Sequence, residues 1–359
     1  MQASESYFSK ARKRLFKNKA AVAGLITIIL SVFIAIFAYF IAMDHTPNAD
    51  RQTVEIQARK PGYKQSFIKV LKPRKVESTS FFSRLLFGKE DPYVLVPVNS
   101  YQDEGDRVTV QKYIDEGLQE PVTYNKSQLA ENYITTKTFW LGTDTFGRDI
   151  LSRLIVGIRV SLAVGLITVL ISLSIGITLG ALAGYYGGKI DDIIMWLINV
   201  VWSMPTLLLV FGLTLTLGKG FWQIFIAVGL TMWVSVARVV RGQVIALSQL
   251  EYVQAARALG LKNSRIIMRH ILPNVLGPVM VIAAANFASA IIIEAGLSFL
   301  GIGIQPPTPS WGLMIKENYN FLITNNPALA LAPGVAIMIL VLAFNLLGNG
   351  LRDAMDVRG

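Results

Sequence analysis

Few residues in this 359-residue chain could carry out chemistry, and their spacing does not suit it. The absence of cysteine excludes disulfides, thiolate metal ligands and a cysteine nucleophile. The two histidines, His45 and His270, are too far apart to suggest a metal-ligand pair, and His270 is expected to pack or hydrogen-bond rather than act as a base. Glu294 is the one acid well inside an apolar run, and no second acid or histidine accompanies it there. The sequence predicts no catalytic residue and no metal site.

Composition indicates that the elements positioning these residues lie in a membrane. Hydrophobic residues make up 53% of the chain and charged residues 16%, with a mean hydropathy of +0.49, as in proteins with several membrane spans. A helix needs about 20 apolar residues to cross a hydrocarbon core. Six runs qualify: 20–43, 162–185, 193–217, 221–246, 277–300 and 329–350. We therefore predict an all-α polytopic protein with six transmembrane helices, in which neighbouring helices compensate for Pro205 and Pro333.

Basic residues around these runs predict their orientation. Residues 1–19 hold six Lys/Arg against one acid, and they precede an apolar run that is too long for a cleaved signal peptide. The segment 247–276, after the fourth run, is basic as well. Six spans place both termini on one side, and these charges indicate the cytoplasmic side of the plasma membrane. The net charge of +11 thus suits anionic lipid rather than nucleic acid.

Between the first two spans lies an insert of a different kind. It is polar, contains β-forming stretches such as 93–96, and is predicted to be an extracytoplasmic domain, irregular or α+β. Its apolar groups at 81–82 and 85–87 are expected on the membrane surface or on a partner. The predicted divisions are the N-terminus with the first span (1–43), the insert (44–138), an interfacial segment (139–161), the five-span core (162–350) and a tail (351–359).

Small residues recur on the second predicted span. Gly176, Gly180 and Gly184 are four residues apart, which places them on one helix face and lets another helix approach closely. That other helix belongs either to this chain or to a second pore subunit.

The most informative stretch lies in the basic segment 247–276. It contains the run QAARALG (254–260) and then HILP (270–273). The small residues would let a partner surface come close, Gly260 is expected to end a short helix, and Pro273 to end a second one. This stretch resembles the EAA signature of the membrane subunits of ATP-binding-cassette (ABC) importers, in which the loop sits in a groove of a separate ATPase. One departure is Gln254, where that family often has Glu, so the charge for a salt bridge is missing.

The resemblance implies a set of ATPase-coupling residues in this loop. They are Gln254, Ala255, Ala256, Arg257, Leu259, Gly260, Leu261, Arg265, His270, Leu272 and Pro273. Apolar contact with the ATPase is expected from Leu259, Leu261 and Ile266. Ion pairs with ATPase acids are expected from Arg257 and Arg265.

Two further stretches narrow the resemblance to the OppC/DppC branch of peptide and nickel permeases. The first is FWLGTDTFGRDILSRL (139–154), and the second is EAGLSFLGIG (294–303) followed by QPPTPSWG (305–312). In the first, Thr143 or Asp144 is expected to cap a helix and Gly147 to make a turn, with surface ion pairs at the external interface. The motif residues are Gly142, Thr143, Asp144, Gly147, Arg148, Asp149 and Arg153. In the second, the prolines are expected to stop the fifth helix.

Such a resemblance implies a transport subunit that is not itself an enzyme. No Gly-x-x-x-x-Gly-Lys-Ser/Thr sequence occurs, so this chain needs no cofactor and partner ATPases would bind ATP and Mg²⁺. The implied partners are a homologous second permease (OppB/DppB-like), two ABC ATPases (OppD/OppF-like), an extracytoplasmic substrate-binding protein (OppA-like), the lipid bilayer and a peptide. Nucleotide would drive alternation between inward-facing and outward-facing states.

The substrate and the pathway are less constrained. An oligopeptide or dipeptide is the expected substrate, and a nickel, metal-chelate or other small-solute importer is the alternative. Outside this class stand a channel, a secondary carrier and a membrane-embedded enzyme. Trp202, Met204, Trp233 and Asn286 are candidates for lining a pathway between two permeases, with packing as the alternative for each. Glu294 is either a pathway or gating residue or part of a structural hydrogen bond or ion pair.

Overall fold

The computed structural model describes residues 7–76, 78–218, 220–323 and 326–355, with side chains from residue 11 onward. The chain forms two compact units. The first takes in residues 1–31, 161–305 and 337–359, and the second residues 32–160 and 306–336. Three of the four boundaries fall within the helices α2 (Lys19–Ile36), α5 (Ile150–Tyr186) and α13 (Ala328–Met355), and the fourth lies between Gln305 and Pro306.

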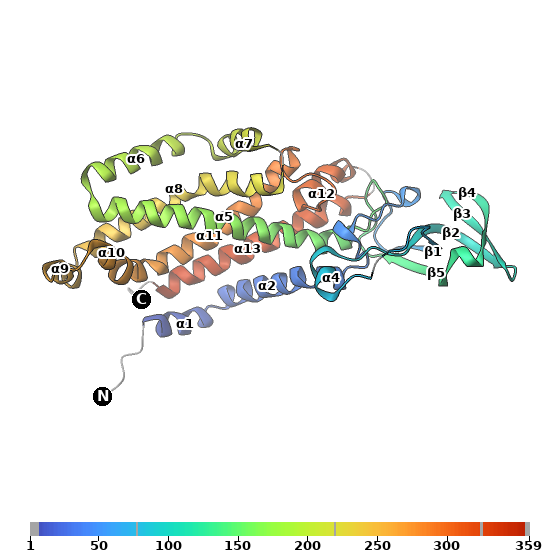
Figure 1. Ribbon diagram of the computed structural model, residues 1–359, viewed down its shortest axis with the longest axis horizontal. Helices are drawn as coiled ribbons and strands as arrows, with labels where there is room; N and C mark the ends of the chain where they lie inside the picture. The colour runs from blue at the N-terminus through green and yellow to red at the C-terminus, as the bar shows by residue number, and fades with distance from the viewer. Residues whose placement is uncertain (1–6, 77, 219, 324–325, 356–359) are drawn as a thin grey trace, which may run out of the picture. The chain divides into compact units, whose positions relative to one another are not determined.

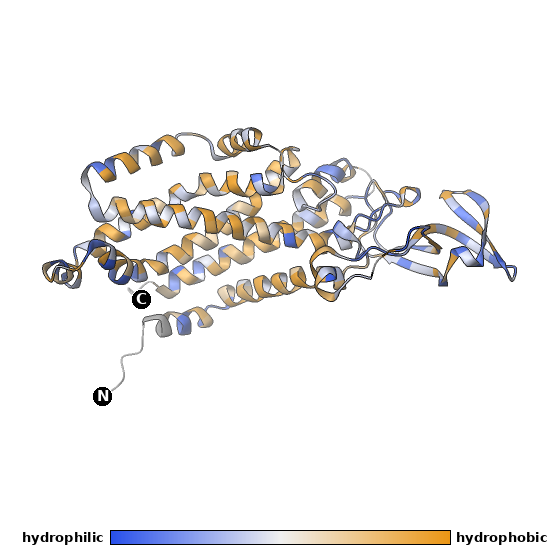
Figure 2. Ribbon diagram, viewed as in Figure 1, coloured by the Kyte–Doolittle hydropathy of each residue, from blue (hydrophilic) through white to orange (hydrophobic). Residues whose placement is uncertain are grey.

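The first unit is helical, and its long helices α5, α8, α11 and α13 run alongside one another (Figure 1). Of these long helices, α8 spans Phe221–Ser248 and α11 spans Leu272–Phe299. The other helices of this unit are α1 (Tyr7–Lys17), α6 (Gly188–Trp202), α7 (Thr206–Leu217), α9 (Glu251–Ala258), α10 (Asn263–Ile266) and η4 (Ile267–Ile271). Apolar residues dominate along the long helices, whereas α1 and α9 are more polar (Figure 2). Among the described residues, five helices are long and apolar enough to span a membrane, or up to six if the bent pair α6–α7 counts as one span.

The glycines of α5 pack against α8 of the same chain. A Cβ atom on Gly176 would lie 2.5 Å from Val236 Cβ, and one on Gly180 would lie 2.5 Å from the Ala237 carbonyl oxygen. On Gly184 it would lie 2.7 Å from the carbonyl oxygen of Arg241. Any side chain at these positions would push the helices apart. Of the two alternatives for this face, the structure supports packing within the chain.

Proline divides one predicted span and leaves another intact. The run 193–217 was expected to be one helix, but α6 ends at Trp202 and α7 begins at Thr206, with an angle of 91° between them. Pro205 lies at the break, because proline lacks an N–H and disfavours helical backbone in the residue before it. Pro333, by contrast, lies inside α13, as predicted.

The second unit contains a five-stranded antiparallel sheet with the order β4-β3-β2-β1-β5. The strands are β1 (Tyr63–Leu71), β2 (Tyr93–Asp103), β3 (Arg107–Asp115), β4 (Leu118–Asn125) and β5 (Leu129–Phe139). Neighbouring residues on β1 belong to different hydrophobic clusters. Phe67 packs with Leu95 and Phe139, whereas Ile68 packs with Val98 and Val108. The insert is therefore α+β and not irregular.

Short helices complete the second unit. They are α3 (Ala38–Ile41), η1 (Pro47–Ala49), η2 (Val54–Ile56), α4 (Phe81–Phe87), η3 (Lys126–Gln128), α12 (Trp311–Asn318) and η5 (Tyr319–Leu322). The indole of Trp311 on α12 donates a hydrogen bond to the Leu154 carbonyl of α5 (3.0 Å). A Cβ atom on Gly157 would lie 2.9 Å from that indole, so the lack of a side chain at Gly157 leaves room for Trp311. This contact fixes the proline-rich segment to the start of α5.

Candidate functional site: the coupling segment and the charged cluster

The coupling segment, residues 250–273, begins with the short helix α9. Gly260 follows its end with a φ of +72°. The N–H of Gly260 donates to the Arg257 carbonyl (2.9 Å), and that of Leu261 donates to the Ala256 carbonyl (3.2 Å). This pair of bonds is the Schellman arrangement that closes a helix, and the left-handed backbone favours glycine. The predicted role of Gly260 as the end of the short helix is confirmed.

The two faces of α9 differ in exposure. Val253 and Ala256 are buried in a cluster with Ile266, Ile267 and Ile271, because a spacing of three residues places both on the inner face. The outer face carries Gln254, Ala255, Arg257 and Leu259, and Leu259 is 82% exposed. The expectation that Ala256 and Ile266 would meet a partner is therefore wrong, because both are used within the chain.

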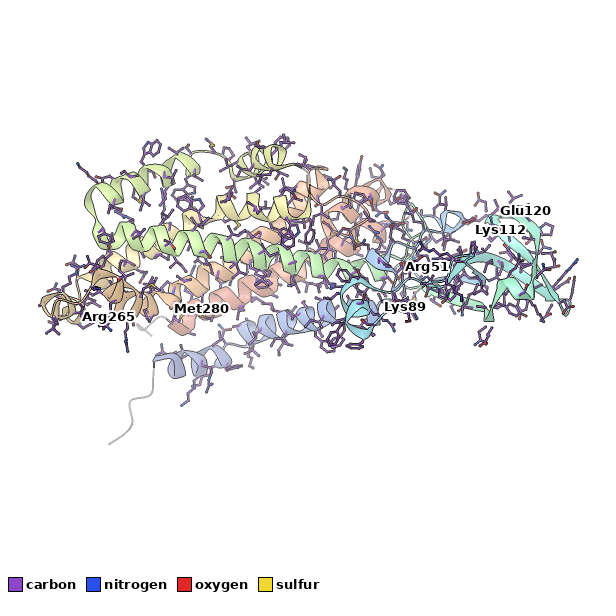
Figure 3. The ribbon with its side chains drawn as sticks, in the orientation of Figure 1. Arg51, Lys89, Lys112, Glu120, Arg265 and Met280 are labelled. Carbon is purple, nitrogen blue, oxygen red and sulfur yellow. The ribbon has the colours of Figure 1, made fainter. Side chains whose placement is uncertain are left out.

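The charges of the segment are mostly exposed. Arg257 lies over the ring of Tyr185, with 4.7 Å between the guanidinium carbon and the ring centroid. Lys262, Arg265 and Arg269 are exposed, and no described carboxylate lies within ion-pair distance of them (Figure 3). The side-chain amide of Gln254 donates to the carbonyl of Gln249, the residue just before the segment (3.1 Å).

The end of the segment differs from the prediction. Pro273 was expected to end a second short helix, but the helical run continues from Asn263 to Phe299. Pro273 lies in the first turn of α11, where a missing N–H costs little. The preceding π-helical turn η4 carries the chain across, with the Leu272 N–H bonded to the Ile267 carbonyl. His270 is half-buried, and its carbonyl accepts a hydrogen bond from Asn274 Nδ2 (2.8 Å).

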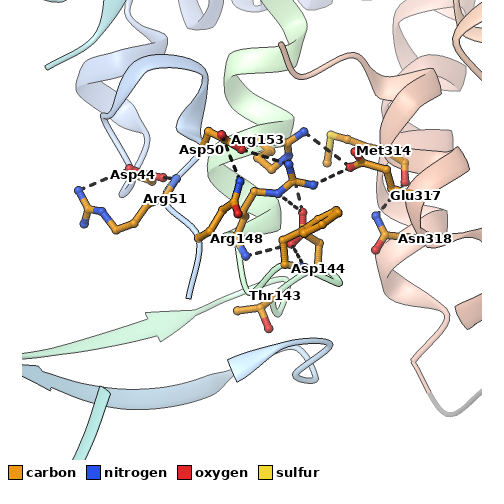
Figure 4. A network of polar contacts seen from close by, with 12 residues as sticks. Asp44, Asp50, Arg51, Thr143, Asp144, Arg148, Arg153, Met314, Glu317 and Asn318 are labelled. Atoms are coloured by element: carbon orange, nitrogen blue, oxygen red, sulfur yellow. Dashed lines mark hydrogen bonds and ion pairs between the residues drawn. The ribbon is translucent and has the colours of Figure 1, made fainter. Parts of the chain in front are cut away.

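The second unit holds the charged cluster, which we define as Asp50, Asp144, Arg148, Arg153 and Glu317 (Figure 4). Arg148 Nε donates to Asp144 Oδ2 (2.6 Å), and its two terminal nitrogens donate to Glu317 Oε2 (2.6 Å) and Asp50 Oδ1 (3.1 Å). Arg153, fully buried, lies 3.5 Å from Asp50 and 3.8 Å from Glu317. Two arginines thus join three segments that are distant in the sequence.

The turn that carries Arg148 folds closely onto residues 53–59. Gly147 has a φ of +71°, and a Cβ atom there would lie 1.7 Å from the Thr53 carbonyl oxygen. Gly142 is similar, with 2.2 Å to the Arg59 carbonyl oxygen. The Thr143 hydroxyl donates to the Ile56 carbonyl and accepts from the Arg59 N–H. The predicted turn at Gly147 is confirmed, and only glycine fits it.

Two expectations for this turn are wrong. Neither Thr143 nor Asp144 caps α5; instead Asp149 Oδ2 accepts from the Ser152 N–H (2.9 Å) and from its hydroxyl. The ion pairs are also buried rather than on the surface, because residues from three segments cover them.

Burial shows in the acid–base properties of the turn. Burial by itself lowers the pKa of Arg148, but Asp144 and Glu317 outweigh that effect and raise the pKa above its ordinary value. Burial raises the pKa of Asp149, opposed by its hydrogen bonds from Ser152. Both shifts follow from removing charges from water and giving them partners.

The candidate pathway residues fall into two groups. Trp233 and Asn286 are buried within the helical unit, whereas Trp202 and Met204 are exposed at the break between α6 and α7. Sequence reasoning missed a neighbour of this break. The Arg238 guanidinium lies 3.4 Å from the centroid of a Trp202 ring, and Arg238 Nη2 donates to Asn199 Oδ1 (2.8 Å). Its only sequence signal was a positive charge in the C-terminal half of α8.

Glu294 is buried near the end of α11. The Ser298 hydroxyl donates to Glu294 Oε1 (2.6 Å) and accepts from the Ile304 N–H (3.0 Å). These bonds tie the helix end to the following turn and favour the structural interpretation of Glu294. In the described part of the chain, no group of three or more His, Cys, Asp or Glu side chains is arranged to hold a metal ion.

Two family models match the chain. One, described as a binding-protein-dependent transport system inner membrane component, matches residues 176–358. The other, described as the N-terminal TM domain of oligopeptide transport permease C, matches residues 6–61. The first alone covers half of the chain and includes the coupling segment.

Curated relatives agree with these models. The dipeptide transport system permease protein DppC of Alkalihalophilus pseudofirmus is 44% identical over 60% of this chain and 71% of its own length. The glutathione transport system permease protein GsiD of Pectobacterium atrosepticum is 43% identical over 63% and 78%. The oligopeptide transport system permease protein OppC of Bacillus subtilis is 41% identical over 62% and 72%. A solved chain of the MetNI methionine ABC transporter has a TM-score of 0.46 at 18% identity, covering 57% of this chain and 97% of its own. The chain therefore belongs to the family of binding-protein-dependent transport system inner membrane components, as a membrane-embedded permease subunit of the OppC/DppC branch.

Proposed function

We propose that this permease forms half of the translocation pathway of an ATP-driven peptide importer. Its partners in this proposal are a homologous OppB/DppB-like permease, two OppD/OppF-like ATPases and an OppA-like binding protein. The chain performs no catalysis, and the ATPases supply ATP hydrolysis. The observation that carries the proposal is the exposed surface of the coupling segment, which presents Leu259 at the end of α9 and basic residues after it, and which no described residue covers.

The inner face of the same helix supports a coupling role. Val253 and Ala256 pack against Ile267 and Ile271 in the run that continues into α11. That run extends unbroken from Asn263 to Phe299, so a push on α9 would reach a membrane span directly. The π-helical turn η4 lies between α9 and α11 in the chain, and such turns occur frequently at functional sites. We infer that α9 acts as a rigid lever on α11.

The proposed orientation puts α9 in the cytoplasm. With α6 and α7 counted as one span, the helices number six and both termini lie on the cytoplasmic side. The exposed Lys262, Arg265 and Arg269 then follow the bias of basic residues toward the cytoplasm. The insert with its sheet would lie on the opposite, extracytoplasmic side.

A peptide substrate is supported by the names of the relatives, which refer to dipeptide, oligopeptide and glutathione transport. The pathway in this proposal passes the break between α6 and α7, where Trp202, Met204 and Arg238 lie together. In this proposal Trp233 and Asn286, which are buried within the helical unit, pack behind the residues that line the pathway. No observation on this chain favours a metal-chelate substrate over a peptide.

Recovery of ATPase subunits with the affinity-tagged chain tests the proposal. The chain would be co-expressed with its second permease and ATPases, as the natural form and as Leu259→Asp. Leu118→Asp is the matched control, since Leu118 is 58% exposed on the sheet of the other unit. Ala256→Asp is unsuitable, because Ala256 is buried within the chain. We expect Leu259→Asp to lower ATPase recovery about tenfold or more, as loss of a central apolar anchor does.

Thermal unfolding of the purified chains completes this test. All three forms should unfold at similar temperatures, since both substituted side chains are exposed. ATPase recovered equally with Leu259→Asp would place docking elsewhere. No ATPase with any of the three forms would refute the importer assignment. Uptake of a labelled dipeptide by the reconstituted complex, dependent on ATP and on the binding protein, tests the substrate class.

A further inference from the structure

The short helix α4 turns its apolar side outward. Phe82 is 74% exposed and Phe87 is 67% exposed, and Phe81 and Leu86 are exposed as well. The polar residues between them, Ser83 and Arg84, are half-buried. A helix on a water-facing surface has the opposite arrangement, with its charged residues outside.

This orientation is held by specific contacts within the second unit. Arg84 lies over the ring of Phe40, with 4.5 Å between the guanidinium carbon and the ring centroid, and the Phe40 and Phe81 rings are 5.3 Å apart. Arg159 Nη1 donates to the Leu86 carbonyl (3.0 Å), and the Lys89 N–H donates to the His45 carbonyl (2.8 Å). A ring contact at the start of α4 and hydrogen bonds at its end prevent it from rolling over to hide its aromatic rings.

The contact of α4 with Phe40 indicates what covers the exposed face of α4. Phe40 belongs to α3, which directly follows the first membrane span, and Phe33, Ile36 and Ile41 expose apolar side chains on the same stretch. Since α4 lies beside the end of α2 (Figure 1), its exposed apolar side chains continue the apolar surface of that span. Aromatic residues are enriched at this level of a bilayer, where hydrocarbon meets headgroups.

The charges flanking α4 suit the same surroundings. Lys75 is exposed ahead of the helix, and Lys89 follows it (Figure 3), whereas the exposed Arg74 pairs with Glu90 at 3.0 Å. Basic side chains beside an apolar helix face are attracted to anionic lipid headgroups. We propose that α4 is an interfacial anchor that lies in the headgroup region of the bilayer and fixes the depth of the first span. The proposal requires that α2 crosses the membrane, and it is independent of the ATPase, the substrate and the orientation.

Spin labels on single cysteines test this proposal, because the chain has no cysteine of its own. Phe82→Cys and Phe87→Cys would be labelled in the assembled importer, in nanodiscs of phosphatidylcholine and phosphatidylglycerol. Leu118→Cys on β4 is the control, since it is similarly exposed but lies on the sheet. Collision rates with oxygen, which concentrates in lipid, and with a water-soluble nickel chelate would be measured at each site.

The three possible environments give different results. In lipid, both α4 labels collide several-fold more with oxygen than with the nickel chelate, while the label at 118 shows the reverse. Collision mainly with the nickel chelate at 82 and 87 would refute the anchor and leave α4 in water. An immobilised label with low rates for both reagents would also refute it, in favour of a protein partner. Labelled complexes must retain the ATPase activity of the unlabelled complex, which shows that α4 has not unfolded.

Discussion

The charged cluster and the coupling segment use the same basic residue types in opposite ways. In the cluster, Arg148 and Arg153 are buried, and carboxylates from three segments meet them. On the coupling segment, Arg265 and its basic neighbours are exposed and meet no described carboxylate. The first set of charges is paired within the chain, whereas the second set remains available to a partner outside the chain.

In the proposed importer, this difference separates residues that maintain the fold from residues that engage a partner. A buried pair loses much of its Coulomb gain to desolvation, but removing one member leaves a charge without compensation. An exposed charge costs little in the free chain, and its effect appears only when a complementary surface desolvates it. Substitutions in the cluster should therefore lower stability, and substitutions on the coupling segment should lower association.

The largest effect is expected from Arg148→Met. It leaves Asp144 and Glu317 buried without their main counter-charge, which should lower the stability by about 3–5 kcal/mol. Thermal unfolding in detergent, followed by size-exclusion chromatography, would measure it as a lower midpoint and loss of monodisperse protein.

Two further variants make that result specific. Arg107→Met, on an exposed arginine of β3, should unfold like the natural chain. Adding Glu317→Gln to Arg148→Met should cost less than the sum of the single changes, because it removes one uncompensated charge. An unfolding midpoint of Arg148→Met equal to that of Arg107→Met would show that the cluster does not hold the unit together.

Two glycines with the same backbone angle sharpen the comparison. Gly147 and Gly260 have φ values of +71° and +72°, but only Gly147 lacks room for a Cβ atom. Gly260→Ala should cost about 1–2 kcal/mol from left-handed backbone alone. Gly147→Ala adds a clash with the Thr53 carbonyl, for a total of about 2–4 kcal/mol. Equal unfolding midpoints for the two variants would contradict the claim that close packing distinguishes the two regions.

The coupling segment was the more predictable region, because its signals are local. A glycine after a short helix and a run of basic residues can be recognised from neighbouring positions, and Gly260 closes α9 as expected. The cluster was recognised only as a motif. Arg148 is 98 residues from Asp50 and 169 from Glu317, so no local pattern predicts that the fold brings them together.

The prolines show the same limit of prediction from local sequence patterns. Pro205, Pro273 and Pro333 each lie in or beside an apolar run, but only Pro205 accompanies a sharp break. Whether a helix continues past a proline depends on the turn before it and on the helices packed around it, which sequence spacing does not encode. For the insert, α+β was one of two alternatives that the sequence left open, and the register of the sheet was not predicted, since cross-strand pairing is a long-range property.

Lys137 gives an intermediate case, a half-buried cation whose neighbours compensate it only in part. Burial, assisted by the positive charge of Arg51, lowers the pKa of Lys137 to about 8, while Asp44 and Asp149 oppose the shift. Between pH of about 8 and the ordinary lysine value, the unfolded chain binds a proton that the folded chain lacks. Stability should therefore rise with pH across that window, by on the order of 3 kcal/mol.

Competitive acetylation across the pH range would measure this titration. Lys126 provides a contrast, because its hydrogen bond to Asp103 raises its pKa. The reactivity of Lys137 should reach half its maximum near pH 8 and that of Lys126 at a clearly higher pH. In the Lys137→Met variant, the rise in stability over this window should disappear. Co-titration of the two lysines would show that Lys137 is solvated.

The smallest effect on the free chain, and the sharpest contrast with Arg148, is expected from Arg265→Glu. The side chain is exposed, so its reversal should leave the unfolding midpoint within error of the natural chain. Affinity for the ATPase subunits should fall about three- to tenfold, and the loss should shrink at high salt because the contribution is electrostatic. Arg107→Glu, an equally exposed reversal on the sheet, should leave ATPase affinity unchanged. If Arg265→Glu destabilised the free chain instead, this arginine would resemble Arg148, and the unpaired charges of the coupling segment would no longer argue for an outside partner.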